Sequence, residues 1–147
     1  MRRHVFAGSV LAAFVLATGS VSTQRPATTV QVYKSPTCGC CANWVKHLQQ
    51  HGFRTQVTET DNVADIKAQH KIPARAQSCH TAIVDGYVIE GHVPATDVQR
   101  LLKERPAIKG ISLPGMPDGA PGMTGRKTEP FTIYELSVGQ PKVYAVE

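Results

Sequence analysis

The sequence predicts a single domain of the α/β class, and three observations lead to this prediction. The chain has 147 residues, which suits one domain of ordinary size. Its composition is 41% hydrophobic and 18% charged, a balance that supports a buried core and excludes a disordered chain. Segments with the two-residue period of strands alternate with segments of helical period, and this alternation is typical of α/β folds with parallel strands.

The first half of the domain is predicted to be a strand–helix–strand–helix unit. Alternating, β-branched residues indicate the strands, and apolar residues three and four apart indicate the helices. Trp44, Val45 and Leu48 form the apolar face of the first helix, and we expect Val63 and Ile66 to face inward on the second. The predicted elements are a strand at 29–33, a loop at 34–41, a helix at 42–51, a strand at 53–58 and a short helix at 60–70.

A β-hairpin and a third helix follow. Residues 81–84 and 87–90 flank the dipeptide Asp85-Gly86, which is a strong signal for a two-residue hairpin turn. A third helix is predicted from Pro94 to Arg105, where the next proline stops it. The order strand–helix–strand–helix–hairpin–helix is that of the thioredoxin-like fold, in which a redox motif lies between the first strand and the first helix.

The last third of the chain differs in composition. Residues 110–125 contain five glycines and three prolines, so we predict a loop without regular structure. A loop of this length indicates a functional role rather than a simple connection. Two further strands are predicted, at 131–136 and at 142–146.

The N-terminus predicts a secretory signal peptide over residues 1–23. A pair of arginines precedes an apolar run at 5–16, and small and polar residues follow it. A retained membrane anchor is the alternative, but the run is shorter than the about 20 apolar residues that a spanning helix needs. The mature domain then covers residues 24–147 and, in a Gram-negative bacterium, lies in the periplasm without stable membrane insertion. In such an oxidising compartment, unprotected thiols form disulfides.

The charge of the chain gives no support for nucleic-acid binding. The formal net charge is +5, and it falls to +3 without Arg2 and Arg3 of the predicted leader. No cluster of lysines and arginines follows that could track a phosphate backbone. Aromatic residues make up 6% of the chain, too few to predict a stacking platform for single strands.

Three of the four cysteines, Cys38, Cys40 and Cys41, lie within four residues. Cys38 and Cys41 form a C-x-x-C pair where the first helix is expected to begin. Free backbone N–H groups and the helix dipole favour a thiolate there, which lowers the pKa of the more N-terminal thiol. This spacing serves both thiol redox enzymes and sites for soft metals.

The third cysteine favours a metal site. A disulfide oxidoreductase has no need of Cys40 between its two active thiols, whereas a thiophilic metal gains from three clustered thiolates. Their softness favours Cu(I), with zinc as the main competitor. Because thiolates can bridge metal ions, we also consider a small cluster of cuprous ions. A structural zinc domain is less favoured, because such sites usually pair two C-x-x-C arms and one is present here.

Cys79 and His80 precede the predicted hairpin. In a thioredoxin-like arrangement the loop that enters this hairpin faces the redox motif, so Cys79 is expected to complete a four-sulfur site. His80 would then act as a ligand or as a hydrogen-bonded partner of one. The alternative is a structural disulfide from Cys79 to one of the other three cysteines, and four cysteines allow three complete pairings.

Met116, Met123 and His92 are further candidate ligands. Both methionines follow a Pro-Gly pair in the long polar loop, where core packing is a poor explanation. Thioether sulfur is a soft ligand that suits copper outside the cytoplasm. The alternatives are two methionines that fill gaps under the loop and a structural His92.

Three separate motifs resemble the CopG-type family of thioredoxin-like periplasmic proteins associated with copper resistance. They are residues 33–41 with Trp44, residues 78–82 with Gly86-Tyr87 and 90–95, and residues 114–117 with 121–123. The resemblance extends from about residue 30 to 134. It implies copper handling with interconversion of Cu(I) and Cu(II). That implication attaches to Cys38, Cys40, Cys41 and Cys79, and more weakly to Met116, Met123, His80 and His92.

The sequence therefore predicts a periplasmic copper-binding protein of copper resistance. Its partners would be copper ions and another periplasmic protein that delivers or receives them. The alternative is an enzyme of one of two kinds. One is a thiol–disulfide oxidoreductase with Cys38 as nucleophile and Cys41 as resolving thiol, acting through a mixed disulfide. The other is a copper oxidoreductase in which the thiols buffer electrons at the metal.

Overall fold

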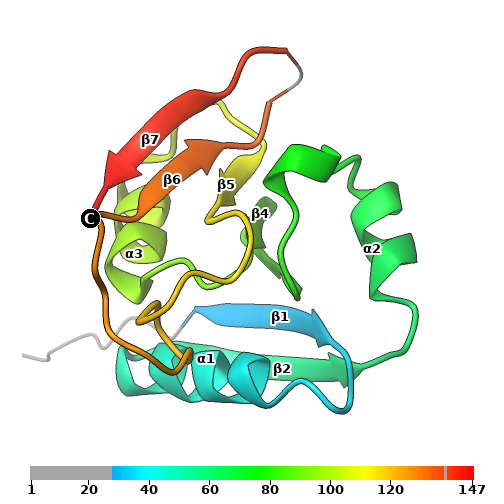
Figure 1. The fold of residues 1–147 in the computed structure, drawn as a ribbon. Coiled ribbons are helices and arrows are strands. Elements are labelled where there is room, and N and C mark those ends of the chain that lie inside the picture. The colour runs from blue at the N-terminus through cyan, green and yellow to red at the C-terminus, as the bar shows by residue number, and fades with distance from the viewer. Residues whose placement is uncertain (1–27, 138) are drawn as a thin grey trace, which may run out of the picture.

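The computed structural model describes residues 28–137 and 139–147, so the predicted signal peptide lies outside the described residues. The described chain forms one seven-stranded sheet with three α-helices and a short 3-10 helix, which confirms the α/β class (Figure 1). In chain order the elements are β1 (Thr29–Lys34), α1 (Gly39–Gln50), β2 (Arg54–Glu59), α2 (Val63–Gln69), η1 (Ala74–Ala76), β3 (Thr81–Val84), β4 (Tyr87–Glu90), α3 (Ala95–Glu104), β5 (Gly110–Ser112), β6 (Thr132–Glu135) and β7 (Lys142–Val146).

The strands lie in the order β2-β1-β3-β4-β5-β6-β7. β1 pairs in parallel with β2 and antiparallel with β3, and β4 forms a second parallel pair with β5. The β3–β4 turn has positive φ at Asp85 (46°) and Gly86 (85°), as the predicted two-residue hairpin turn requires. Both cysteine-bearing segments adjoin β1 and β3, the second and third strands of the sheet.

The sheet buries apolar side chains on both faces. One face carries the main core, to which α1 contributes Trp44 and Leu48 and α3 contributes Val98 and Leu101. Neighbouring residues of β4 point to opposite faces, so Ile89 joins the main core while Val88 joins a smaller cluster with Ile72, Ala76 and Leu136. Within residues 28–137 and 139–147, no helix combines the length and apolar character that a membrane crossing requires.

The helix predicted at 42–51 begins earlier, at Gly39. Cys38 is its N-cap, and its sulfur accepts a hydrogen bond from the Cys41 backbone N–H. Serine, threonine, aspartate and asparagine are the usual caps, so a cysteine cap gave no boundary signal in the sequence. Cys40 and Cys41 consequently lie in the first helical turn rather than in a loop.

Two further expectations were wrong. Residues 110–112 were predicted as part of an irregular loop, but they form β5, whose Ile111 is fully buried beside β4. The pairing needs Gly110, because a Cβ there would lie 1.9 Å from the carbonyl oxygen of Val88. On α2, Ile66 is only half-buried, whereas the charged Lys67 is buried.

Candidate metal centre

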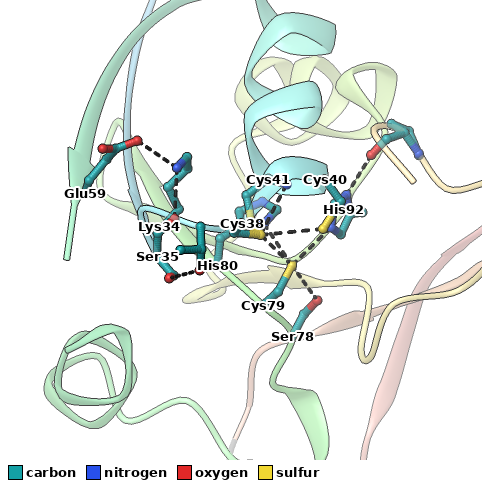
Figure 2. The surroundings of a disulfide bond; sticks show 12 residues. Lys34, Ser35, Cys38, Cys40, Cys41, Glu59, Ser78, Cys79, His80 and His92 are labelled. Atoms are coloured by element: carbon teal, nitrogen blue, oxygen red, sulfur yellow. Dashed lines mark hydrogen bonds and ion pairs between the residues drawn. A yellow bond between two sulfur atoms is a disulfide. The ribbon is translucent and has the colours of Figure 1, made fainter. Parts of the chain in front are cut away.

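The N-terminus of α1 presents the first three cysteines. The Cys41 N–H lies 3.3 Å from Cys38 Sγ and donates to it, so the helix end directs a backbone dipole at this sulfur. Cys38 and Cys41 form a disulfide in the structure, and Cys40 and Cys79 are free thiols (Figure 2). Cys41 is fully buried, whereas Cys38, Cys40 and Cys79 are partly exposed. Three of the four cysteines are therefore in contact with solvent.

The fourth cysteine closes the group. Cys40 Sγ lies 3.5 Å from Cys38 Sγ, and Cys79 Sγ lies 3.5 Å from Cys41 Sγ. The four sulfurs all lie within 4.8 Å of one another. The loop that enters the β3–β4 hairpin thus faces the α1 N-terminus, as the sequence predicted. Four sulfurs at these separations can hold a soft metal ion, or bridge several, once the disulfide is reduced.

Two histidines meet the fourth cysteine. Cys79 Sγ lies 3.1 Å from His92 Nε2 and 3.4 Å from His80 Nδ1, and the two rings stand edge to face. His92 Nδ1 lies 2.7 Å from the Pro121 carbonyl oxygen. A carbonyl oxygen only accepts, so the neutral ring carries its proton on Nδ1 and turns the lone pair of Nε2 toward Cys79. Metal-binding histidines commonly have this arrangement.

Burial keeps both imidazoles neutral and the thiol protonated. It lowers the pKa of His80 well below its usual value, and the adjacent His92 ring and the Lys67 ammonium lower it further. Burial also lowers the pKa of His92. For Cys79, burial and the adjacent Cys40 raise the pKa to about 11. Metal binding at this cluster therefore has to displace a proton from Cys79, whereas the two histidines are ready to coordinate.

The long loop after β5 lies against the cluster at two places. The Gly115 carbonyl oxygen accepts a hydrogen bond from the Ser78 hydroxyl, one residue before Cys79. Gly122 lies on the first turn of α1, where an added Cβ would be 2.6 Å from Trp44 N and 2.7 Å from the Cys40 carbonyl oxygen. Its φ of +86° also favours glycine. These contacts connect the loop to both cysteine-bearing segments.

The structure brings six of the eight predicted residues together at measured distances, and the two methionines are not among them. Met116 is 56% exposed at the surface of the loop, and Met123 is partly buried against the main core. The packing of Met123 agrees with the alternative that it fills a gap. Whether any of the eight residues binds metal stays a prediction.

A buried ion pair next to the cluster was not predicted. Lys67 Nζ of α2 lies 2.5 Å from Glu90 Oε1 at the end of β4, and the Glu90 side chain is fully buried. This carboxylate also accepts hydrogen bonds from Ser78 N–H and from the Thr81 hydroxyl, each at 2.7 Å. The only signal in the sequence was a glutamate in an otherwise apolar hairpin strand.

Comparisons with known proteins agree with this arrangement. The model of a family described as "Protein of unknown function, DUF411" matches residues 76–123. No curated protein matches the chain. Two solved structures, titled copper resistance protein CopG forms 2 and 1, are each 36% identical to the chain, with TM-scores of 0.76 and 0.75. The matches cover 82% and 84% of this chain and 98% of each CopG chain. The chain therefore belongs to the CopG family.

Proposed function

We propose that the protein binds Cu(I) through its four cysteines and acts in copper resistance. The observation that carries this proposal is the convergence of four sulfurs within 4.8 Å of one another. The two similar solved structures are of a copper resistance protein, which supports copper as the metal. Thiolates are soft ligands, so they favour Cu(I) over harder divalent ions, and zinc is the competitor to test.

The ligand set that we propose is Cys38, Cys40, Cys41 and Cys79, with the His80 and His92 imidazoles at the Cys79 side. Cys79 belongs to both groups of potential ligands, one of four sulfurs and one of a sulfur with two nitrogens. A shared sulfur suits a cluster of cuprous ions bridged by thiolates. Met116, exposed on the loop, would offer a first soft contact to incoming copper, and Met123 a supporting one.

The Cys38–Cys41 pair gives the site a redox step. Two Cu(II) ions each take one electron from this dithiol, the S–S bond forms, two protons leave, and two Cu(I) ions result. The reverse step, with Cu(I) as the electron donor and two protons taken up, restores the dithiol. The disulfide of the structure corresponds to the oxidised state of this exchange. Cys40, Cys79 and the two imidazoles stay available in that state.

The proposal includes export and a fold of the thioredoxin type. The strand–helix–strand–helix–hairpin–helix order, with the C-x-x-C pair at the start of α1, supports that fold. A signal peptide over residues 1–23 would deliver the domain of residues 24–147, including the 110–125 loop, to the periplasm. There it would exchange copper with another periplasmic protein. N-terminal sequencing of the protein from a periplasmic extract tests the export and its cleavage site.

Anaerobic titration with Cu(I) against a competing chelator tests the function. We expect the fully reduced protein to take up Cu(I), the oxidised protein to bind it more weakly, and Cys40→Ser mainly to weaken binding. When Cu(II) is the titrant, one disulfide should form for every two Cu(I) released. Reduced protein that takes up no copper above background would refute the proposal, and a preference for zinc would redirect it.

One observation favours a second candidate function, thiol–disulfide exchange. Cys38 is partly exposed at the helix N-terminus and accepts the Cys41 N–H, whereas Cys41 is buried beneath it. An exposed, dipole-stabilised nucleophile above a buried resolving thiol is what such an enzyme needs. Insulin reduction by metal-free protein distinguishes the two functions. Strong activity that survives Cys40→Ser would favour the enzyme.

A further inference from the structure

We infer that Glu90, with Lys67 as its counter-ion, is a positioning residue that holds Cys79 and His80 at the metal centre. Glu90 Oε1 accepts the backbone N–H of Ser78 and Oε2 accepts the Thr81 hydroxyl, both at 2.7 Å. The two contacts lie at opposite ends of residues 78–81, which we call the Cys79 segment. One carboxylate thus fixes both ends of the segment that carries the cysteine and the histidine.

Both charges of the Lys67–Glu90 pair are buried. The Glu90 side chain has no exposed surface and that of Lys67 is 8% exposed. Lys67 also donates a hydrogen bond to the Thr81 hydroxyl oxygen at 3.0 Å, so lysine, threonine and glutamate form a closed triangle. A buried ion pair contributes little net stability compared with apolar residues of similar size. Fold stability alone therefore explains this pair poorly, and its fixed geometry explains it better.

The fixed geometry matters at the Cys79 segment, because Cys79 must keep its distances to the other candidate ligands within narrow limits. Cys79 Sγ lies 3.1 Å from His92 Nε2 and 3.5 Å from Cys41 Sγ, so a displacement of about 1 Å changes both distances to a degree that ligand geometry does not tolerate. The segment has no ladder pairing before Thr81, where β3 begins. Beyond the Glu90 carboxylate, three hydrogen bonds restrain the segment: the Ser78 hydroxyl donates to the Gly115 carbonyl oxygen, Lys67 to the Thr81 hydroxyl oxygen, and the Gly91 N–H to the His80 carbonyl oxygen.

The oxidised protein offers a test that needs no metal. Its two free thiols, Cys40 and Cys79, can be alkylated and quantified separately by mass spectrometry, so Cys40 is an internal reference. We expect Glu90→Gln to raise the rate of Cys79 alkylation relative to Cys40 by about tenfold, because the segment opens locally more often. A role in global stability alone would raise both rates together.

Three further variants keep the test decisive. Glu90→Gln leaves Lys67 buried without its partner, so the double variant Lys67→Met/Glu90→Gln serves if the single one unfolds. Thr81→Val, which removes one contact and keeps the side-chain shape, should raise the ratio less.

The matched control is Glu59→Gln, the same change in the exposed partner of the Lys34–Glu59 pair, whose charged atoms lie 2.9 Å apart. It should leave the ratio unchanged. Folded variants whose ratio equals that of the wild type would overturn the inference.

The consequence for copper rests on the proposed function. Glu90→Gln or the double variant should lower the Cu(I) affinity by roughly 10- to 100-fold, as is usual for residues that orient metal ligands, and Glu59→Gln should not. A wild-type protein that takes up no Cu(I) would refute the proposed function, while the alkylation ratio still decides the positioning role. Unchanged affinity together with an unchanged ratio would refute the positioning role alone.

Discussion

The two cysteine-bearing segments reach the same cluster by different means. Residues 38–41, the motif segment, owe their geometry to local structure, because Cys38 caps α1 and pairs with a cysteine one helical turn away. The Cys79 segment, residues 78–81, is fixed by side chains from α2 and β4 and by the long loop. One half of the site is thus a property of a helix end, and the other half is a property of the tertiary fold.

The largest expected difference between the segments is in copper affinity. Cys79 belongs to both groups of potential ligands, whereas Cys40 belongs to the four-sulfur group alone. We therefore expect Cys79→Ser to lower the Cu(I) affinity by roughly 100-fold and Cys40→Ser by about tenfold. Competition titrations of both reduced variants measure this. Equal losses would mean that the two segments contribute alike and that the histidines take no part.

The contact between the long loop and the motif segment can be broken at Gly122. Gly122→Ala combines a positive φ with a Cβ 2.6 Å from Trp44 N, and should lower the free energy of unfolding by about 2 kcal/mol. Gly115→Ala is the control, because its φ is also positive (69°) but nothing lies within 4 Å of the added Cβ. Urea denaturation compares the two. Equal losses would show that the loop does not press on α1.

Protonation of His80, which lies in the Cys79 segment, should lower the stability of the protein at acidic pH. The usual pKa of 6.5 applies in the unfolded chain, and burial lowers the pKa well below it in the folded protein. Below pH 6.5 the unfolded state therefore binds a proton that the folded state excludes, so stability falls as the pH falls. Relative to His80→Phe, the wild type should lose roughly 1 kcal/mol of unfolding free energy between pH 6.5 and 5.5.

Denaturant titrations of both proteins at the two pH values measure this difference. Burial and the neighbouring Glu147 raise the pKa of Asp97 to about 6, so this carboxyl stabilises the fold on acidification. Because Asp97 is present in both proteins, its contribution cancels in the comparison. Parallel pH profiles for wild type and His80→Phe would mean that His80 takes up its proton in the folded state.

The smallest expected effects concern the two methionines. If Met116 is a first contact for copper, Met116→Leu should slow Cu(I) uptake from a chelated donor by about threefold and leave the equilibrium affinity unchanged. Met123→Leu should leave uptake unchanged and cost less than about 1.5 kcal/mol of stability, because Met123 packs against the core. Stopped-flow uptake and urea denaturation test the pair. Equal uptake rates would remove Met116 from the copper path.

The local elements of the fold were predictable from the sequence. The hairpin strands β3 and β4 have the predicted bounds, and the Asp85-Gly86 turn adopts the expected positive φ angles. β5 was missed because a three-residue strand among glycines and prolines has too few side chains to show a period. Its pairing depends on Gly110 approaching the backbone of Val88, which is a tertiary contact.

The candidate site divides in the same way. The C-x-x-C pair at a helix end and the position of Cys79 opposite it followed from element order alone. The burial of Lys67 could not be predicted from the sequence, because a lysine on a short helix normally lies at the surface. Only the fold brings it 2.5 Å from Glu90, which is 23 residues further along the chain.

Trp44 gives the cluster its own optical reporter. It is the one tryptophan of the chain, it is fully buried, and its indole N–H donates to the Val93 carbonyl oxygen at 2.8 Å. Its ring lies 4.4 Å from that of His80, which in turn contacts Cys79. A metal ion coordinated by His80, or a proton taken up by it, would place a positive charge on the ring next to the indole. The emission of the unlabelled protein should therefore follow copper loading and acid titration at a single known position.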